Sequence, residues 1–456
     1  MSIEQQLSLH LAELRYEKIP DEAVTATRKL LLDTVVSMAA SLRSPECHKL
    51  RDSWIQLGGV GESSLIGSEE KVPASTAALI NGAFAHWYEW DDVHIPGILH
   101  ASAVLFPTLI AAAEAASLGG DEVSGTEFLA TVVAAFDVAA RSSEALVPVM
   151  HNGWMPTGNA VIGAAGGAAR LLGLDAAGIH SAMGIAASTM GVSRQPIKDR
   201  VNGKNILCGL VAEQAIRAVL LARQGIRGTP DFLFGAFGAS ALFASDQGSK
   251  EKAVAGLGQH FSVMDSSIKY YPCCQSTHGC IDVTLDLLQG SPVSHTEIEA
   301  IYLRLPKKNY ELVGAPFAFG DDPRVSAQFN VSYTVALALC RGAVRIDDFN
   351  SDTVRSAEDV FNLASKVTVT VNDEAAHEVR IFYRDGSIRE GKTSIFRGNP
   401  KRPLTTAESR QKFDDALLVL EPQSQVNQLY DAIEGAADFN LKTMTKWMRA
   451  ARTTTS

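Results

Sequence analysis

The chain has 456 residues, of which 46% are hydrophobic and 20% are charged, and its formal net charge is −10. These values and a mean hydropathy of +0.04 are typical of a globular protein and argue against a disordered chain. The acidic charge argues against a general nucleic-acid binder, because binding to phosphates needs a dense basic face. The length exceeds that of a usual single core and predicts two domains.

The first residues of the chain lack a basic segment followed by an apolar core, so we expect no secretory signal. The longest apolar run, residues 98–113, contains His100 and Pro107 and is shorter than the roughly 20 residues of a membrane span. Six cysteines are too few for a disulfide scaffold. We therefore expect a cytoplasmic protein with reduced thiols and no membrane association.

Apolar residues recur at spacings of three and four through the first 265 residues, which predicts successive helices. Asp21 is expected to cap the helix that follows it. Further helices are predicted at residues 74–88, 101–118, 125–146, 159–172, 175–190 and 207–224. The resulting prediction is an all-helical domain over residues 1–265.

After residue 265 the apolar spacing changes to two, which predicts strands around Leu303 and Val369. A third strand around Ile381 leads into Asp385-Gly386, a preferred hairpin turn, and a helix is predicted at residues 328–341. This order predicts a smaller α+β domain over residues 266–402. The tail returns to helical spacing, so residues 403–456 are expected to complete the helical domain, giving a mainly α fold with a second α+β domain.

Acids and imidazoles crowd into the segment HWYEWDDVHIPGILH, which begins at residue 86. It contains Glu89, Asp91, Asp92, His94 and His100 beside three aromatic residues. Such crowding shifts pKa values toward those that proton transfer near neutral pH requires. Two other interpretations stay open: a capped loop with solvated acids, and a divalent metal site formed by Asp91, Asp92, His94 and His100.

A local basic patch stands out in this acidic chain. Its members are Arg194, Lys198, Arg200 and Lys204, within the segment SRQPIKDRVNGK. Cationic side chains of this kind are natural receivers for substrate carboxylates. A solvated loop between two helices is the alternative.

The segment KYYPCCQSTHGCID contains three cysteines and His278. Zinc ligation is not expected, because adjacent cysteines such as Cys273 and Cys274 seldom bind one ion and no paired Cys-x-x-Cys is present. His278 is interpreted as an acid/base or a hydrogen-bonding group. Residues 386–393 match the G-x-x-x-x-G-K-[ST] pattern, but they start inside the predicted hairpin turn, so we expect no phosphate loop there.

These segments, together with GWMPTG, KNILCG, AQFNVSYTVALAL and NPKRPLTTAESRQKF, resemble the MmgE/PrpD family over nearly the whole chain. That family includes 2-methylcitrate dehydratase, cis-aconitate decarboxylase and iminodisuccinate epimerase. The resemblance implies a large helical domain, a smaller α+β domain, an active site between them, a homodimer, and chemistry without metal or organic cofactor.

Position by position, the resemblance places Glu89 where the family commonly has aspartate. The residues at matching positions of the family's pocket are Asp91, Asp92, His100, Lys204, His278 and Tyr333. Three positions depart from the family, because Val93 replaces a frequent threonine, and Met155 and Leu207 each replace a frequent histidine. The departures favour a smaller or less charged acid as substrate.

The functional expectation is a cofactor-free lyase or isomerase that removes a proton next to a carboxylate of a small di- or tricarboxylic hydroxy acid. A dehydratase of the 2-methylcitrate type is expected first, with a decarboxylase or an epimerase as alternatives. The predicted catalytic residues are Glu89, Asp91, His100, Lys204 and His278, and the predicted substrate-binding residues are Asp92, Arg194, Lys198 and Tyr333. A metal-dependent hydrolase and a non-catalytic paralogue that binds an organic acid are the rival hypotheses.

Overall fold

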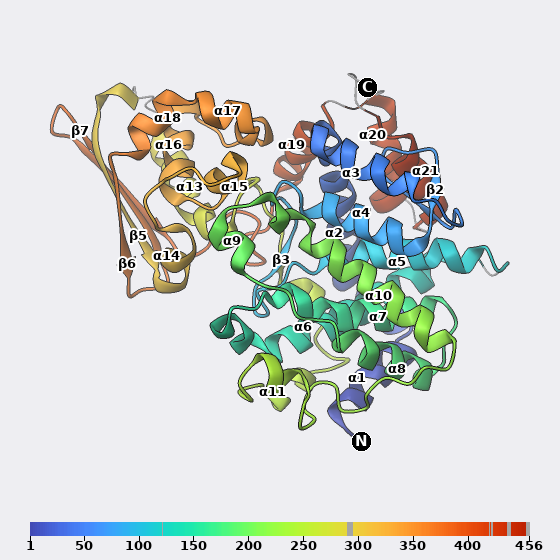
Figure 1. Cartoon of the computed structure of the whole chain (residues 1–456). Coiled ribbons are helices and arrows are strands. Elements are labelled where there is room, and N and C mark those ends of the chain that lie inside the picture. Colours follow the sequence, from blue (N-terminus) through green and yellow to red (C-terminus); the bar gives the residue numbers. More distant parts are fainter. Residues whose placement is uncertain (121, 290–294, 419, 421–422, 436–438, 453–456) are drawn as a thin grey trace.

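The computed structural model describes residues 1–120, 122–289, 295–418, 420, 423–435 and 439–452. Helices dominate the first 265 residues (Figure 1). They are α1 (Ile3–Glu13), α2 (Asp21–Ala40), α3 (Pro45–Gln56), α4 (Ala74–His86), α5 (Ser102–Ser117), α6 (Gly125–Ala145), α7 (Ala160–Leu171), α8 (Ala176–Ala187), α9 (Gln195–Asp199), α10 (Leu207–Arg223), α11 (Ala239–Phe243) and α12 (Lys250–Val254). Three short strands also lie here, β1 (Ser63–Ser64), β2 (Lys71–Val72) and β3 (Val93–His94).

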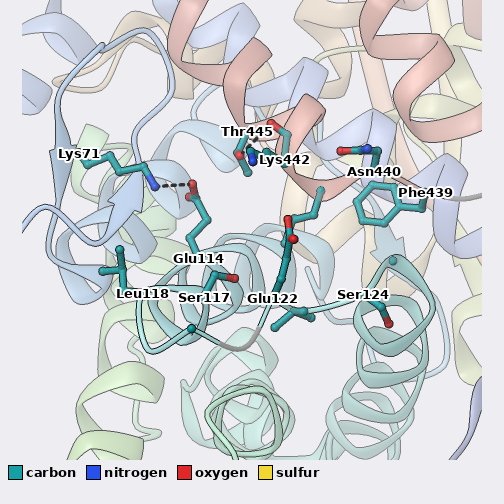
Figure 2. Close-up of a pocket in the computed structure, with 14 residues that line it drawn as sticks. Lys71, Glu114, Ser117, Leu118, Glu122, Ser124, Phe439, Asn440, Lys442 and Thr445 are labelled. Atoms are coloured by element: carbon teal, nitrogen blue, oxygen red, sulfur yellow. Dashed lines mark hydrogen bonds and ion pairs between the residues drawn. The ribbon is translucent and has the colours of Figure 1, made fainter.

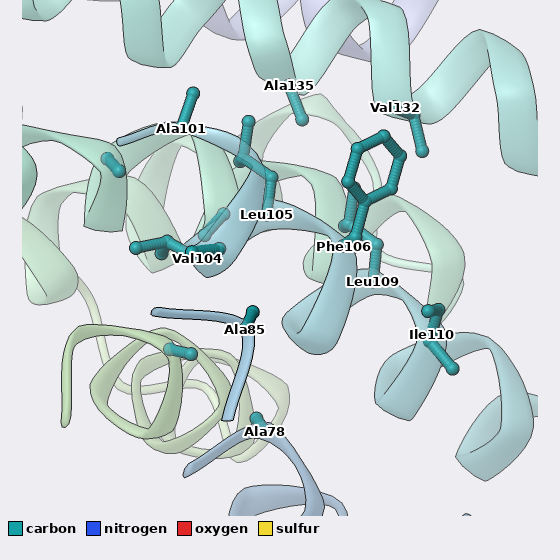
Figure 3. Packing of buried hydrophobic residues seen from close by; sticks show 14 of the residues in the cluster. Ala78, Ala85, Ala101, Val104, Leu105, Phe106, Leu109, Ile110, Val132 and Ala135 are labelled. Atoms are coloured by element: carbon teal, nitrogen blue, oxygen red, sulfur yellow. The ribbon is translucent and has the colours of Figure 1, made fainter. Parts of the chain in front are cut away.

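Small residues let the central helices approach one another closely. A Cβ atom on Gly209 of α10 would lie 2.1 Å from the carbonyl oxygen of Leu79 in α4, and a Cβ on Gly163 of α7 would lie 2.2 Å from the carbonyl oxygen of Ala135 in α6. Only glycine permits these crossings. Figure 3 shows the side chains of α5 packed between alanines of α4 and residues of α6 such as Val132. The helical part therefore has an alanine- and glycine-rich core.

Helix α10 belongs to this core although its composition resembles that of a membrane span. An 18-residue window within the helical run 202–223 has a mean hydropathy of 1.5, and 56% of that window is buried. It packs against α4, α5, α7 and α8. Its apolar character is that of a core helix.

The second part of the chain contains a four-stranded sheet. Its strands are β5 (Ile298–Pro306), β6 (Val367–Asn372), β7 (His377–Tyr383) and β8 (Ile388–Thr393), in the order β6-β5-β7-β8. Strand β5 runs parallel to β6 and antiparallel to β7. The helices of this part are α13 (Gln275–Leu288), α14 (Lys307–Val313), α15 (Pro323–Gln328), α16 (Val331–Arg341), α17 (Ser351–Ser356) and α18 (Glu358–Ala364), and they lie on one side of the sheet (Figure 1).

The predicted strands and hairpin are confirmed. Ile301, Leu303 and Leu305 alternate into the core. The turn at Asp385-Gly386 joins β7 to β8, with Gly386 at a φ of 85°. The formal phosphate-loop match runs from this turn into β8 and opens no helix, as expected.

Some predicted helix boundaries are wrong. The helix predicted at residues 328–341 breaks at Phe329-Asn330, because the Asn330 side chain accepts a hydrogen bond from the backbone N–H of Tyr333 and starts α16 anew. Asp21 is the first residue of α2 and makes no capping hydrogen bond, since Pro20 holds the cap position. Helix α4 ends at His86, two residues before the predicted end.

The C-terminal helices are α19 (Thr406–Leu417), α20 (Gln423–Tyr430) and α21 (Leu441–Ala450). Phe413 and Ala416 of α19 belong to the same hydrophobic cluster as Leu7 near the N-terminus. A separate cluster runs from Tyr271 to Tyr383 around the sheet. The mainly helical fold with a smaller α+β part is confirmed, and the exact domain boundaries stay a prediction.

Candidate active site

Three structural features shape the loop that carries the acids and imidazoles. Helix α4 ends at His86, and Glu89 then adopts a left-handed φ of 55°, which reverses the chain. Strand β3 pairs antiparallel with β4 (Ser266–Ser267), so the loop is joined to a segment that is distant in the sequence. One oxygen of Asp92 accepts a hydrogen bond of 3.1 Å from the first amide of α5, at Ser102. The acidic side chains are thereby fixed in the interior.

The Glu89 carboxylate bridges two buried lysines. Lys204 donates to Oε2, and Lys269 donates to Oε1 at 2.7 Å and to the main-chain oxygen of Glu89 at 3.0 Å. All three side chains are at most 2% exposed. Three separate segments therefore converge on one carboxylate: the turn after α4, the 3₁₀ turn Asn202–Ile206, and the segment after β4.

Asp91 joins two imidazoles. Its two oxygens accept hydrogen bonds of 2.9 Å from Nδ1 of His86 and from Nδ1 of His100. These bonds direct the opposite ring nitrogens toward Glu89, at 3.7 Å for His86 Nε2 and 3.9 Å for His100 Nε2. His100 is the most accessible member, with 13% of its side chain exposed. A carboxylate that fixes the orientation and tautomer of a histidine ring in this way commonly prepares that ring for proton transfer.

Burial and charge shift the ionisation of this cluster. Burial lowers the pKa of His86 to about 3, so its ring is neutral at physiological pH. Burial alone would raise the pKa of Asp91, but the two imidazoles outweigh it and hold that pKa well below its ordinary value. Burial and the neighbouring charge of Asp91 raise the pKa of Asp92 to about 7. Burial and the charge of Lys269 lower the pKa of Lys204 well below its ordinary value, which opposes its charged form, whereas the contact with the Glu89 carboxylate favours that form.

Within the described part of the chain, no hydrogen bond or ion pair joins the other predicted site residues to this cluster, although the charge of Lys269 acts on His278. His278 of α13 donates through Nε2 to the carbonyl oxygen of Cys273 at 3.3 Å, and burial lowers its pKa to about 3. Tyr333 packs against Phe317, and burial raises its pKa. Arg194 donates to the carbonyl oxygen of Met150, and Lys198 is exposed. The roles predicted for these four residues stay predictions.

Sequence reasoning missed three side chains that complete the cluster. Lys269 begins the cysteine-containing segment KYYPCCQSTHGCID, but nothing in its spacing connects it to Glu89. His86 lies in the acidic segment and received no role. Lys412 of α19 is buried and donates to Asp33 at 2.5 Å and to the carbonyl oxygen of Trp90 at 2.9 Å. Lys269 and Lys412 come from distant parts of the chain, so only the folded structure brings them here.

Helix α15 and the residue after it hold the turn from the α+β side. The Gln328 amide donates to the carbonyl oxygens of Tyr88 at 2.7 Å and Pro272 at 2.9 Å. The Arg324 guanidinium lies 4.6 Å from the Trp87 ring centre, and the Lys204 ammonium lies 5.0 Å from that of Phe329. The segments that carry Glu89 and Lys269 are thus fixed to each other through Gln328.

Two groups of side chains in the cluster have the spacing of metal ligands. They are His86, Glu89 and His100, and His86, Asp91 and Cys208. However, both oxygens of Glu89 already accept from ammonium groups, so a dication in the first group would face two positive charges. His94, expected as a ligand under the metal hypothesis, instead accepts a backbone hydrogen bond from Gly97. The arrangement favours an anion over a cation near Glu89.

A cavity of about 610 Å³ lies elsewhere, between the end of α5 and α21 (Figure 2). Its buried acid is Glu114, which pairs with Lys71 at 3.1 Å and accepts two hydrogen bonds from Ser64. These contacts satisfy the carboxylate and tie β1 to α5. A cavity of about 220 Å³ is lined by Trp90 and Lys412 and adjoins the cluster.

Comparison with known proteins gives matches over most of the chain. Models of the MmgE/PrpD N-terminal domain and C-terminal domain match residues 5–252 and 271–434. A cis-aconitate decarboxylase of Aspergillus terreus is 25% identical over 454 residues, covering 93% of this chain and 91% of the relative. The cis-aconitate decarboxylase of Homo sapiens is 23% identical, covering 90% and 87%, and that of Mus musculus is 24% identical, covering 93% and 88%.

Proposed function

The chain belongs to the MmgE/PrpD family and is a lyase, and we propose that it transfers a proton at a carbon next to a carboxylate of a small organic acid. The observation that carries the proposal is the convergence of Lys204, Lys269 and His100 around the Glu89 carboxylate. Two ammonium groups and one oriented imidazole supply what such a reaction needs. No step of the proposal requires a metal or an organic cofactor.

The two lysines stabilise the negative charge that develops on the substrate during the reaction. Removing a proton or carbon dioxide next to a carboxylate places an electron pair on carbon, and conjugation moves it onto the carboxylate oxygens. Lys204 and Lys269 are fixed in a buried environment, where an ammonium stabilises such charge far better than water does. Their positions are set before the substrate arrives, so little reorganisation accompanies the reaction.

His100 carries the proton. Asp91 holds its Nδ1, which leaves Nε2 directed toward the Glu89 carboxylate that both lysines contact. Its partial exposure lets it exchange protons with solvent between turnovers, whereas the more deeply buried His86 serves to orient Asp91. In this assignment Asp91 is a positioning residue, since it reaches the substrate only through His100.

Two bond cleavages fit this arrangement. In decarboxylation, the carbon–carboxylate bond breaks, carbon dioxide leaves, and His100 delivers a proton to the carbon that keeps the electron pair. In dehydration, His100 removes a proton from carbon and passes it to the β-hydroxyl, whose bond to carbon breaks and which leaves as water. Decarboxylation is tested first, because the curated relatives are cis-aconitate decarboxylases. Dehydration of an acid of the 2-methylcitrate type is the second candidate, since it needs the same proton transfer.

The test uses purified protein in deuterated water with a panel of hydroxy and unsaturated mono-, di- and tricarboxylic acids. The expected result is loss of a substrate signal in the proton NMR spectrum, with deuterium entering next to a carboxylate. Carbon dioxide release identifies decarboxylation, and a new alkene signal identifies dehydration. The His100→Ala variant should lose the activity while keeping the wild-type melting temperature. Unchanged turnover in that variant would show that the proton carrier is another group.

A further inference from the structure

Three successive carbonyl groups in the turn after α4 accept hydrogen bonds from long, buried side chains. In chain order the pairs are Tyr88 with Gln328 at 2.7 Å, Glu89 with Lys269 at 3.0 Å, and Trp90 with Lys412 at 2.9 Å. The third donor comes from α19, in the C-terminal part of the chain. Lys412 is thus a buried cation beside the site to which the proposed proton transfer assigns no part.

Lys412 holds the peptide group between the lysine half and the imidazole half of the cluster. The Trp90 carbonyl belongs to the peptide bond that leads into Asp91, whose side chain orients His100. Among the described residues, no second hydrogen bond to this peptide group is found. The Trp90 ring is fixed separately, since its Nε1 donates to the carbonyl oxygen of Tyr270 at 3.0 Å. The direction in which Asp91 leaves the turn therefore depends on the Lys412 ammonium.

Asp33 of α2 anchors this ammonium. Its Oδ1 accepts a hydrogen bond from Lys412 at 2.5 Å, and both side chains are at most 1% exposed. The other oxygen of Asp33, Oδ2, is buried and has no hydrogen-bond partner among the described residues. Within that part of the chain, the Asp33 carboxylate therefore has Lys412 as its single hydrogen-bonding partner.

Burial opposes both charges of this pair. It raises the pKa of Asp33 and lowers the pKa of Lys412, while the ammonium is attracted by Asp33 and Asp91 and repelled by Lys269. Apolar side chains would join α2 and α19 at least as well, because a buried ion pair seldom stabilises a fold more than a well-packed apolar pair does. A link between two helices is therefore a poor explanation for the charges, and a donor for the Trp90 carbonyl is a better one.

We propose that Lys412 is a positioning residue of the proton-transfer site. Anchored by Asp33, its ammonium holds the Trp90 carbonyl, and the peptide fixed in this way directs Asp91 toward His100. Lys412 acts on the substrate only through these two side chains. The inference rests on the proposed function for the identity of the reaction. It makes α19 part of the site, although this helix follows the α+β part in the sequence and packs against α2.

The test measures kcat, KM and melting temperature for single and double variants. Lys412→Met removes the donor, so kcat should fall about 10- to 100-fold, the effect of losing one charge-assisted hydrogen bond, while KM changes less than about threefold. The double variant Asp33→Asn and Lys412→Met leaves no buried charge unpaired and should regain the melting temperature that the single variant loses. Its kcat should stay low, because the Trp90 carbonyl still lacks its donor. Lys412→Arg keeps a charged donor and should be more active than Lys412→Met.

An added ammonium gives a second readout. Lys412→Ala removes three methylene groups and the ammonium, which together match propylammonium in size and charge. A cavity of about 220 Å³, lined by Lys412 and Trp90 among others, gives this molecule a route to the vacated position. Propylammonium should raise kcat of Lys412→Ala at least about fivefold. Propan-1-ol, which lacks the charge, and tetramethylammonium, which lacks an N–H donor, should not.

Arg170→Met is the matched control, because Arg170 of α7 is also a buried cation that binds a carboxylate and a carbonyl oxygen. Its guanidinium donates to the Glu127 carboxylate at 2.8 Å and to the carbonyl oxygen of Leu11 at 2.8 Å. Neither partner belongs to the site. This variant should lower the melting temperature and leave kcat within about threefold of the wild type.

A third readout needs no catalysis. In spectra of ¹⁵N-histidine-labelled protein, the Nδ1–H signals of His86 and His100, which bond to Asp91, should move in Lys412→Met and stay in place in Arg170→Met. Signals that do not move in Lys412→Met would overturn the proposal even if the wild type transfers no proton to or from any acid. Signals that move in an inactive wild-type background would refute the proposed function and leave the positioning role of Lys412 intact.

Two kinetic results would also overturn the role of Lys412. One is a kcat that recovers together with the melting temperature in the double variant, because Lys412 would then act through stability alone. The other is equal rescue of Lys412→Ala by propylammonium and by the two control additives, or rescue by none of them. If the wild type exchanges protons of an acid, the proposed function survives either result.

Discussion

Replacing Asp91 with asparagine tests whether this carboxylate orients the His86 and His100 rings for proton transfer. The substituted amide would keep the size of the side chain but would present one NH₂ group where an oxygen now accepts from an imidazole. Asp91 is fully buried, and both of its hydrogen bonds to Nδ1 atoms are 2.9 Å long. One ring must then turn or change tautomer, and the remaining bond loses its charge assistance.

The magnitude follows from these two bonds. A hydrogen bond to a charged group contributes about 1.5–3 kcal/mol and a neutral one about 1 kcal/mol less, so losing one bond and the charge assistance of the other destabilises the prepared state by about 2.5–4 kcal/mol. Because about 1.4 kcal/mol corresponds to a factor of ten, kcat/KM should fall by about 10²–10³-fold. The loss should appear in kcat more than in KM, since Asp91 acts through His100 and does not touch the substrate.

The assay is deuterium incorporation followed by NMR across pH 5 to 9, with Asp92→Asn as the matched control. The Asp92 side chain also lies in this loop, but it binds the amide of Ser102 and no imidazole. The control should retain activity within about tenfold. A kcat/KM for Asp91→Asn within threefold of the wild type would refute the inference that Asp91 prepares His100 for proton transfer.

Three further predictions concern charge and positioning. Asp92 has a pKa of about 7 in the folded state, above its unfolded value, so the folded protein loses stability as the pH rises from the unfolded pKa to the folded pKa. Asp92→Asn should therefore raise the melting temperature more at pH 8 than at pH 5, and equal shifts at the two pH values would contradict this. Lys269→Gln should lower kcat/KM about 10- to 100-fold, because a charge-assisted bond to a carboxylate is lost; a change below threefold would exclude Lys269 from the site. Gln328→Leu leaves two buried carbonyl groups without donors and should lower the free energy of unfolding by about 2–4 kcal/mol in urea titrations, whereas a loss below about 0.5 kcal/mol would show that the bonds are replaced.

The fold was largely predictable because its elements have strong periodic patterns. The spacing of apolar residues marks the long core helices, and the alternation around Leu303 marks the central strand of the sheet. The break between α15 and α16 was missed, because the capping bond of Asn330 interrupts a pattern that remains apolar on both sides. Boundaries decided by one hydrogen bond are not visible in periodicity.

The site was predictable only where it is local in sequence. Glu89, Asp91 and His100 lie within twelve residues, so their crowding marked them directly. Lys204 was identified as a cation in an acidic chain. Lys269 reaches Glu89 only because β4 pairs with β3. These two strands are far apart in the sequence, so no local pattern predicts the contact.

The central claim is that His100 transfers a proton to or from a carbon held beside Lys204 and Lys269. It is tested most directly by counting solvent deuterium in the product by mass spectrometry after turnover of an accepted acid in deuterated water. The account predicts one deuterium per decarboxylated product, bound next to the retained carboxylate, and no product from His100→Gln. Product formed without solvent deuterium, or formed at the wild-type rate by His100→Gln, would contradict it.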